Sequence, residues 1–474
     1  QALVLVPEIG LTPQLLERFR ARFDVPVVAL HSGLTAAERL AAWRSARDGE
    51  AGVVIGTRSA VFTPLARCGL IVVDEEHDAS LKQQDGFRYS ARDLAVVRAR
   101  LQDVPVVLGS ATPSLETLHN AGRGRYERLH LPERPGQAVH PTMRLIDLRV
   151  TPTRDGLTAP LLTAIRRHLD DGGQVMLFLN RRGFAPTLFC PGCGWTADCP
   201  RCDARLTLHQ RPDGLQCHHC GHRSARTAIC PDCGEEPVAA GQGTERIEEA
   251  LARHFPDAPL ARLDRDTVRS RGELEAVLAG MRDGHTRLLV GTQMLTKGHD
   301  FPGVTLVGVL NADQGLFGTD FRSDERLAQT ILQVSGRAGR RDRPGEVLLQ
   351  TSFPEHPLLA CLIDGGYEDF ARQALTHRSA AGWPPFAHLA LVRAEAVARS
   401  EPQDFLAACA GLARDLLPAT VRILGPAPSP MERRQGRYRA QLLLQTTERP
   451  ALRRALPAAR RVRWSLDVDP GELF

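Results

Sequence analysis

The sequence has 474 residues, a length that predicts two to four domains of roughly 100–200 residues each. Hydrophobic residues make up 43% and charged residues 24%, and the net charge is only +5. These values are typical of a soluble globular protein, and so weak a net charge means that nucleic acid would be met by local basic patches. No apolar run approaches the roughly 18–20 residues that span a bilayer. We therefore expect a cytoplasmic protein with no membrane partner.

Residues 1–135 alternate short apolar runs with amphipathic stretches that carry helix start signals. Thr35 with Glu38 fits a capping box, and Thr12 followed by Pro13 fits an N-cap with proline at the first helical position. Unbroken apolar strands between helices predict a parallel sheet covered on both faces, with ligands at the carboxyl ends of the strands. The expected strands are Ala2–Pro7, Val25–Leu30, Gly52–Thr57, Leu70–Glu75 and Val104–Ser110.

A second α/β unit begins near Leu157, and a cysteine-rich segment interrupts it. Its expected buried strands are Val175–Asn180, Arg287–Thr292, Thr305–Asp313 and Glu346–Thr351. From about Glu368, proline-rich turns and the basic stretch Arg433–Arg439 indicate a separate small α+β domain. The predicted domains are a first lobe over residues 1–149, a second lobe over 150–188 and 235–367, an insertion over 189–234, and a C-terminal domain over 368–474.

The apolar strand before Asp74 ends in the acids Asp74, Glu75 and Glu76. An aspartate at the carboxyl end of a strand can hold the water shell of Mg²⁺, and the next glutamate can orient and deprotonate an attacking water. A charged turn after a strand is the alternative interpretation. The segment GSATP from Gly109 follows another apolar strand, and its small hydroxyl residues can sense these acids. Alternatively it is a plain turn into a helix, capped by Thr112 or Ser114.

The segment QVSGRAGR from Gln333 places Arg337 and Arg340 three positions apart, on one face of a predicted helix. Two cations there can neutralise the charge on a γ-phosphate, and the glycines between them would let a bound group approach the backbone. An arginine-rich surface helix is the alternative interpretation.

Eight of the eleven cysteines form four CxxC pairs. One pair places two thiolates on one side of a tetrahedron, and two pairs complete a Cys₄ zinc site, so the pattern predicts two structural zinc ions. Spacing leaves the pairing open between a nested and a sequential arrangement, and an iron–sulfur cluster is the rival metal. The ligands are Cys190, Cys193, Cys199, Cys202, Cys217, Cys220, Cys230 and Cys233.

In this order and spacing, DEEH from Asp74, GSAT from Gly109 and QVSGRAGR resemble motifs II, III and VI of superfamily 2 helicases. GTQMLTKGHD from Gly291 resembles motif V, GTRS from Gly56 motif Ib, and VPE from Val6 motif Ia. The resemblance implies two RecA-like lobes that use ATP and Mg²⁺. It implies catalysis by Asp74, Glu75, Arg337 and Arg340, and coupling through Ser110, Thr112 and Gln333. It also implies nucleotide contacts by Asp74, Glu75, Gly298 and Asp300, and DNA contacts by Thr57, Arg58 and Thr292.

With its cysteine-rich insertion, the chain is similar to the replication-restart helicases of this superfamily. That implies an ATP-dependent 3′→5′ DNA helicase that recognises stalled or collapsed replication forks and initiates primosome assembly. Implied partners are forked and single-stranded DNA, single-strand-binding protein, and the proteins that load the replicative helicase; we expect a monomer. The stretch KQQDGFRYS resembles the family's aromatic-rich loop, in which Lys82, Phe87, Arg88 and Tyr89 would meet DNA by stacking and charge.

No Gly-x₄-Gly-Lys-Ser/Thr phosphate loop occurs in these residues. The family's loop would precede Gln1, so we expect a truncation inside the first lobe and a fragment that is inactive as an ATPase by itself. An ATP-independent scaffold that binds DNA and primosome proteins is the alternative function. A motor acting on RNA is a third, which the cysteine insertion disfavours.

Overall fold

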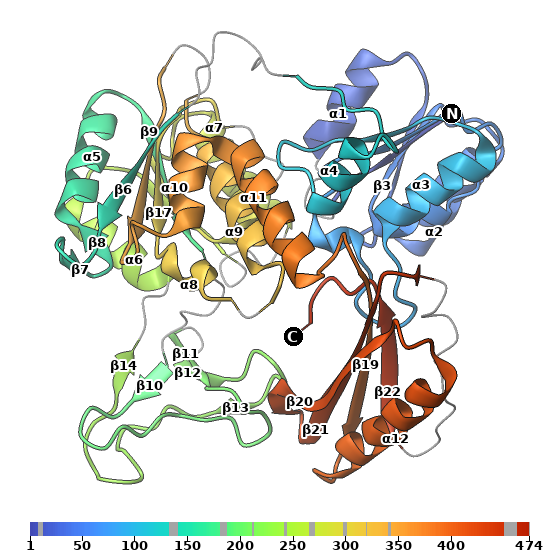
Figure 1. The fold of residues 1–474 in the computed structure, drawn as a ribbon. Coiled ribbons are helices and arrows are strands. Elements are labelled where there is room, and N and C mark those ends of the chain that lie inside the picture. The colour runs from blue at the N-terminus through green and yellow to red at the C-terminus, as the bar shows by residue number, and fades with distance from the viewer. Residues whose placement is uncertain are drawn as a thin grey trace. The chain divides into compact units, whose positions relative to one another are not determined.

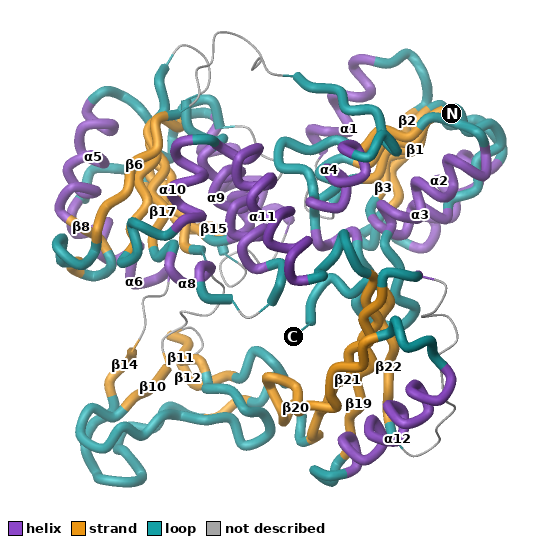
Figure 2. Tube along the Cα trace, viewed as in Figure 1, coloured by secondary structure: helices purple, strands orange, loops and turns teal. Residues whose placement is uncertain are grey.

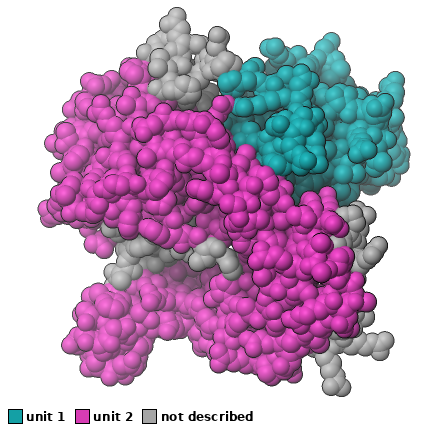
Figure 3. Space-filling model, viewed as in Figure 1, with its two compact units in different colours: residues 1–132, 296–300 teal, residues 133–295, 301–474 magenta. Residues whose placement is uncertain are grey.

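The computed structural model describes residues 1–7, 13–131, 141–180, 187–210, 213–240, 244–264, 271–296, 301–318, 320–339, 343–449 and 462–473. The chain divides into two compact units, residues 1–132 with 296–300, and residues 133–295 with 301–474 (Figure 3). Over the described ranges, no helix combines the length and the apolar character that crossing a membrane requires.

The first unit is built on a five-stranded parallel sheet with the strand order β2-β3-β1-β4-β5 (Figure 1). All five predicted strands are confirmed, each beginning or ending a few residues inside its predicted run. Their bounds are β1 Ala2–Leu5, β2 Val27–Leu30, β3 Val53–Gly56, β4 Leu70–Val73 and β5 Val106–Leu108.

Apolar cores lie on both faces of this sheet, as the unbroken apolar strands predict. Leu3, Leu5 and Ile71 pack with alanines of α3, whereas Val4 and Ile55 pack on the opposite face. The predicted capping box is confirmed at the start of α2, and Thr12 lies outside the described residues. The helices are α1 Pro13–Arg22, α2 Ala36–Arg47, α3 Ala91–Gln102 and α4 Leu115–Gly122, with short 3-10 turns at η2 Arg58–Phe62 and η3 Ala79–Leu81.

The second unit contains a six-stranded parallel sheet with the order β15-β16-β9-β17-β18-β6. Its strands are β6 Thr142–Asp147, β9 Gln174–Leu179, β15 Leu260–Leu263, β16 Leu288–Gly291, β17 Val304–Leu310 and β18 Glu346–Thr351. Strands β9, β16 and β17 are buried along their whole length, which accounts for their continuous apolar sequences. The helices of this lobe are α5 Ala159–Asp170, α6 Thr244–His254, α7 Arg271–Arg282, α8 Asp313–Leu316, α9 Ser323–Ser335, α10 Pro357–Asp364 and α11 Gly366–Ala381.

Two predicted boundaries of the second lobe differ from its elements. Strand β6 precedes the boundary predicted between residues 149 and 150, yet it pairs with β18 at the edge of the second sheet. Helix α11 runs through the boundary predicted between residues 367 and 368. The sequence does not predict β6, because most residues of this edge strand alternate between exposed and half-buried positions and so form no continuous apolar run.

The cysteine-rich insertion consists largely of loops (Figure 2). Two small sheets organise it, and its core combines cysteines with a few leucines such as Leu188, Leu206 and Leu215. So small an apolar core favours a fold that depends on metal ligation. The strands are β10 Thr187–Phe189 with β14 Val238–Ala240, and β11 Thr207–Gln210 with β12 Asp213–Gln216 and β13 Arg223–Ser224.

In its described residues, the C-terminal domain is a four-stranded antiparallel sheet with α12 packed against it, which confirms the predicted α+β class. Its order is β20-β21-β19-β22. The elements are β19 His388–Ala396, α12 Glu401–Leu416, β20 Arg422–Arg434, β21 Arg437–Thr446 and β22 Arg463–Val468.

Candidate functional site

The register of the first sheet brings the predicted site segments to one edge. Leu5 is opposite both Gly56 and Val73, so β1, β3 and β4 end at the same level. The amide of Asp74 donates to the Leu5 carbonyl at 2.8 Å, and the amide of Gly109 donates to the Val73 carbonyl at 2.8 Å. The acids, Thr57 and the GSAT segment therefore share the carboxyl edge, where parallel sheets bind ligands.

Asp74 and Glu75 leave β4 in a tight turn. The Glu75 amide donates to Asp74 Oδ1 at 3.0 Å. The Asp74 side chain stays accessible, but nearby protein atoms displace part of its water and raise its pKa, an effect that the Glu75 amide and His77 partly oppose. Glu75 has a φ of +46°, a left-handed conformation that is uncommon for a side chain of this size and typical of functional sites.

His77 connects the acids to the GSAT segment. Its Nδ1 lies 2.7 Å from Ser110 Oγ and 3.6 Å from Glu75 Oε2. Ser110 Oγ also accepts from the Thr112 amide at 2.9 Å. The structure thus brings the predicted coupling residues Ser110 and Thr112 into one chain of contacts with the acids. Of the two caps that the sequence allows for α4, the structure shows Ser114, whose hydroxyl accepts from the Thr117 amide.

The third acid, Glu76, has a structural position that the sequence did not reveal. Its side chain is 2% exposed. It accepts from the Ser114 amide at 2.6 Å, from the Ser114 hydroxyl at 3.0 Å and from the Thr117 hydroxyl at 2.9 Å. Arg92 forms an ion pair with it at 3.2 Å. Glu76 therefore joins β4 to α3 and α4 beneath the accessible acids.

The aromatic-rich loop forms an irregular hairpin on the same unit. Lys82 and Ser90 form a β-bridge, and the Gln83 amide donates to the Tyr89 carbonyl at 2.8 Å. Phe87 is 79% exposed, and its ring stacks beside that of Tyr89 at 6.1 Å between centroids. Phe87 presents an open face, as the sequence predicts, whereas Tyr89 is half-buried and packs against the apolar core of the unit and the ring of Phe62.

Arg58 has a supporting contact in addition to its predicted role at DNA. Its Nη1 donates to the carbonyls of Ser80 and Lys82 at 2.9 and 3.2 Å. This arginine therefore joins the segment after β3 to the base of the aromatic-rich loop. The Arg88 side chain folds back onto its own loop, where its Nε donates to the Gln84 carbonyl at 2.8 Å.

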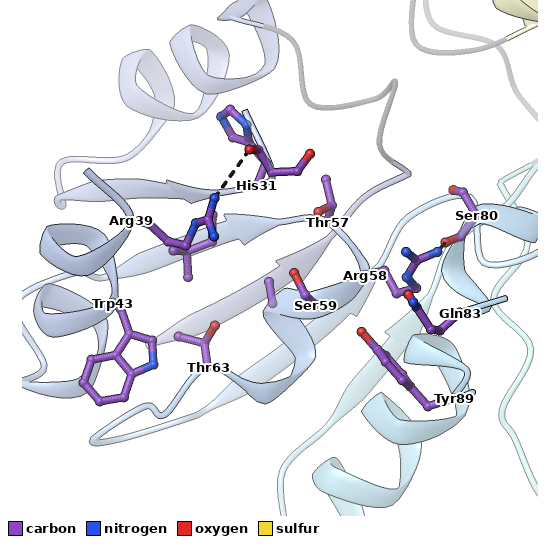
Figure 4. Close-up of a pocket in the computed structure, with 13 residues that line it drawn as sticks. His31, Arg39, Trp43, Thr57, Arg58, Ser59, Thr63, Ser80, Gln83 and Tyr89 are labelled. Carbon is purple, nitrogen blue, oxygen red and sulfur yellow. Dashed lines mark hydrogen bonds between the residues drawn. The ribbon is translucent and has the colours of Figure 1, made fainter. Parts of the chain in front are cut away.

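A pocket of about 320 Å³ lies between α2, the segment after β3 and the aromatic-rich loop (Figure 4). Arg39 and Arg58 provide positive charge, and Trp43 and Tyr89 provide aromatic faces. This combination suits a phosphate with its attached base. The lining residues are Leu30, His31, Ser32, Arg39, Trp43, Thr57, Arg58, Ser59, Ala60, Thr63, Ser80, Gln83 and Tyr89.

On the second unit, the arginine segment begins where α9 ends. Gln333 lies in the last turn of the helix, which stops at Ser335 with Gly336 as its cap. The prediction that Arg337 and Arg340 share one helical face is therefore wrong, because Arg337 lies in the turn after the helix. Arg340 itself lies outside the described residues.

Glycines place this turn against the sheet. Gly339 has a φ of +69°, and its amide donates to the Val304 carbonyl at 3.1 Å. A Cβ at Gly339 would lie 2.5 Å from the Gly345 nitrogen. Thr292 follows β16 and is 8% exposed, whereas Gly298 and Asp300 lie outside the described residues.

The cysteines form two four-thiol clusters in the nested arrangement, one of the two that the spacing allows. Within each cluster the sulfur atoms lie within 4.8 Å of one another. Cys190 and Cys233 Sγ are 3.4 Å apart, and Cys199 and Cys220 Sγ are 3.6 Å apart. Tetrahedral zinc with Zn–S of about 2.3 Å requires roughly 3.8 Å, so both clusters fit Zn²⁺. The clusters are Cys190, Cys193, Cys230 and Cys233, and Cys199, Cys202, Cys217 and Cys220.

Four family models match successive parts of the chain. The DEAD/DEAH box helicase model matches residues 1–121, and the helicase conserved C-terminal domain matches residues 238–342. The PriA DNA helicase Cys-rich region domain matches residues 199–224, and the primosomal protein N C-terminal domain matches residues 379–471.

Curated relatives align with nearly the whole chain. Replication restart protein PriA of Haemophilus influenzae is 47% identical, and the alignment covers 100% of this chain and 66% of that protein. The Bacillus subtilis protein of that name is 41% identical, with coverage of 94% and 56%. That of Treponema pallidum is 40% identical, with coverage of 94% and 68%. The chain thus spans less than two thirds of the Haemophilus and Bacillus proteins.

Among solved structures, RecG bound to a three-way DNA junction aligns with 79% of this chain and 40% of its own at 16% identity, with a TM-score of 0.43.

Proposed function

The chain belongs to the replication restart protein PriA family, and from that premise we propose that the whole protein is an ATP-dependent 3′→5′ DNA helicase that acts at stalled or collapsed forks. Its two parallel sheets are the RecA-like lobes of a superfamily 2 helicase. The observation that carries the proposal is the set of contacts at the carboxyl edge of the first sheet. There Asp74 and Glu75 are accessible, and His77 connects them to Ser110.

In the proposed mechanism, Asp74 holds the hydrated Mg²⁺ of Mg²⁺-ATP, and Glu75 orients and deprotonates the attacking water. The raised pKa of Asp74 reflects a carboxylate that has lost part of its water, and such a carboxylate gains from a nearby cation. Arg337 and Arg340 stabilise charge on the transferred phosphoryl group, and Gly298 and Asp300 contact the nucleotide. Gln333 takes part in coupling from the last turn of α9.

The proposed DNA contacts on the first unit are Thr57, Arg58, Lys82, Phe87, Arg88 and Tyr89, with Thr292 on the second. Stacking on Phe87 and Tyr89 would contribute about 1–3 kcal/mol per base. Because Arg58 bonds the carbonyls of Ser80 and Lys82, DNA that displaces the loop also shifts the segment after β3. That segment and the acids share one sheet edge, so the loop is positioned to report DNA occupancy to the site of hydrolysis.

The zinc clusters support a second part of the proposal, the assembly of a primosome. Their fit to two Zn²⁺ ions indicates a rigid insertion that can present a surface to other proteins. We propose that the insertion and the C-terminal domain contact single-strand-binding protein and the proteins that load the replicative helicase.

The test is Glu75→Gln in the full-length protein. Loss of the proposed base should reduce DNA-stimulated ATP turnover by roughly 10²–10⁴-fold. Binding of Mg²⁺-ATP and forked DNA should be retained, because glutamine keeps the size of the side chain. Glu127→Gln alters an exposed acid of the same unit and serves as the matched control. Wild-type turnover in Glu75→Gln would refute the assignment.

The alternative function is an ATP-independent scaffold that binds DNA and primosome proteins. It is favoured for this 474-residue chain by itself, in which no Gly-x₄-Gly-Lys-Ser/Thr occurs. A titration with Mg²⁺-ATP decides the matter, since micromolar affinity of this chain would exclude the scaffold-only interpretation. Unwinding of matched DNA and RNA forks by the full-length protein separates the DNA helicase from an RNA motor.

A further inference from the structure

The tip of the C-terminal hairpin rests on one of the two zinc clusters. Strands β20 and β21 are joined by Gln435 and Gly436, whose φ angles of +54° and +77° are typical of a tight two-residue turn. On one side of this turn the Asp203 amide donates to the Arg433 carbonyl at 2.9 Å. On the other side the Gly436 amide donates to the Arg201 carbonyl at 2.8 Å. The hairpin therefore pairs backbone to backbone with the segment that carries Cys202.

Between these two bonds the hairpin reaches a metal ligand directly. The Gln435 amide donates to Cys202 Sγ at 3.2 Å, across 233 positions of sequence. Other thiols of the clusters accept from an amide two residues further along their own segment. These pairs are Cys193 with Trp195, Cys199 with Arg201, Cys220 with His222, Cys230 with Asp232 and Cys233 with Glu235.

Side chains add contacts around this bond. The Asp203 carboxylate accepts from the Arg433 amide at 2.6 Å, and the Arg433 guanidinium lies 3.5 Å from the same carboxylate. The Gln435 side-chain amide reaches the His219 carbonyl at 3.5 Å. His219 lies between Cys217 and Cys220, so the hairpin contacts both CxxC segments of a single cluster.

We propose that the C-terminal hairpin is the outer-shell partner of zinc at Cys199, Cys202, Cys217 and Cys220, so that zinc in this cluster and docking of the hairpin stabilise each other. Zinc fixes the two CxxC segments in the relative position that the hairpin contacts. It also keeps the Cys202 sulfur an anion, and an anionic acceptor strengthens the bond from the Gln435 amide. Linkage of this kind is reciprocal, so each event must favour the other by the same factor.

Zinc release measures one direction of the linkage. In the full-length protein, Asp203→Arg places a cation against Arg433 without touching a ligand. A chromophoric chelator should then remove one of the two zinc ions roughly 10–100-fold faster, the range typical of lost outer-shell partners. The other ion should leave at the wild-type rate.

Two further variants calibrate zinc release. Asp213→Arg makes the same charge change at an exposed aspartate of the insertion that belongs to neither cluster, and should leave both rates unchanged. Gln435→Gly keeps the backbone amide and the positive φ but removes the contact with the His219 carbonyl, so the zinc ion that Asp203→Arg affects should leave faster than in wild type and more slowly than in Asp203→Arg. Unchanged release of both ions in Asp203→Arg would overturn the proposal.

Cleavage by trypsin measures the other direction of the linkage, the effect of zinc on docking of the hairpin. Of the arginines at the hairpin tip, Arg433 is half-buried and bonds Asp203 of the insertion, so docking should protect the peptide bond after Arg433. Cys202→Ser and Cys193→Ser each disable one cluster, and metal analysis should find one zinc in each. Cleavage at the tip should accelerate in Cys202→Ser alone. Equal cleavage in the two variants would show that the hairpin does not depend on its own cluster, and so would contradict the proposal even if Asp203→Arg fails to fold.

Discussion

The carboxyl edge of the first parallel sheet and the amino edge of the second, where β17 and β18 begin, hold their site residues in different ways. On the first sheet, side-chain contacts fix the site residues. His77 bonds Ser110, and the buried Glu76 joins β4 to α3 and α4 beneath Asp74 and Glu75. On the second sheet, the turn that carries Arg337 is held by its backbone, with Gly339 bonded to β17 and packed against Gly345.

This difference follows from the chemistry proposed for each edge. A metal ligand and a general base must stay accessible, so their positions depend on neighbouring residues that are free to be buried. An arginine that reaches a phosphate needs length and a fixed starting point, and a turn pressed onto the sheet provides that point. The first edge should therefore be sensitive to loss of a buried side chain, and the second to addition of a side chain at a glycine of the turn.

The largest effect is expected at the buried acid of the first edge. Glu76→Ala removes the acceptor for the Ser114 amide, for two hydroxyls and for the Arg92 guanidinium. The Ser114 amide is then left buried without its acceptor, and Arg92 is left with its ion pair to the half-exposed Asp93, so we expect the free energy of unfolding to fall by about 3–5 kcal/mol. Hydrogen exchange of the β4 and β5 amides should accelerate accordingly.

Glu127→Ala, at an exposed acid of the same unit, is the control and should change the unfolding free energy by less than about 0.5 kcal/mol. Equal stability of Glu76→Ala and Glu127→Ala would contradict the inference that buried side chains support the carboxyl edge of the first sheet.

A smaller effect is expected from the glycine of the second edge. Gly339→Ala puts a Cβ 2.5 Å from the Gly345 nitrogen and also strains a positive φ. The strain alone costs about 1–2 kcal/mol, and forced contact with backbone adds about 1–3 kcal/mol. Gly284→Ala isolates the first contribution, because Gly284 has a φ of +79° and nothing within 4 Å of the new Cβ. Exchange rates of β17 amides give the difference, and equal rates would contradict the close approach.

The sequence predicts the parts of this fold that depend on continuous burial. Strands such as Val304–Leu310 and Val53–Gly56 are recognisable because a parallel sheet buries both of their faces. Strand Thr142–Asp147 is not, because an edge strand needs only partial burial. The helical face predicted for Arg337 and Arg340 fails for a related reason. The glycines that suggested close approach of a ligand instead end the helix and bring the turn to the sheet.

Among the site residues, the sequence locates the acids but does not separate their roles. Three carboxylates follow one strand, and only the positions of Ser114 and Arg92, distant in sequence, make Glu76 structural. The zinc pairing is undetermined for the same reason, since either arrangement can close with loops of these lengths. The contact of Gln435 with Cys202 has no sequence signal at all, because a backbone amide leaves no trace in residue type.

The smallest effect concerns Asp74 and depends on pH. Its pKa is raised in the folded chain, so the protonated carboxyl favours folding relative to the carboxylate. That contribution is complete below the ordinary pKa of 3.8 and is lost as pH rises through the raised value. Asp74→Asn has no such titration. The variant should therefore gain stability over wild type as pH rises through this window, and keep that advantage at neutral pH in the absence of Mg²⁺. Urea unfolding at a series of pH values measures the gain. If the stability difference between Asp74→Asn and wild type stayed constant with pH, the carboxyl edge of the first sheet would not desolvate Asp74. The two edges would then differ in the contacts that hold their site residues, but not in the free energy of placing those residues there.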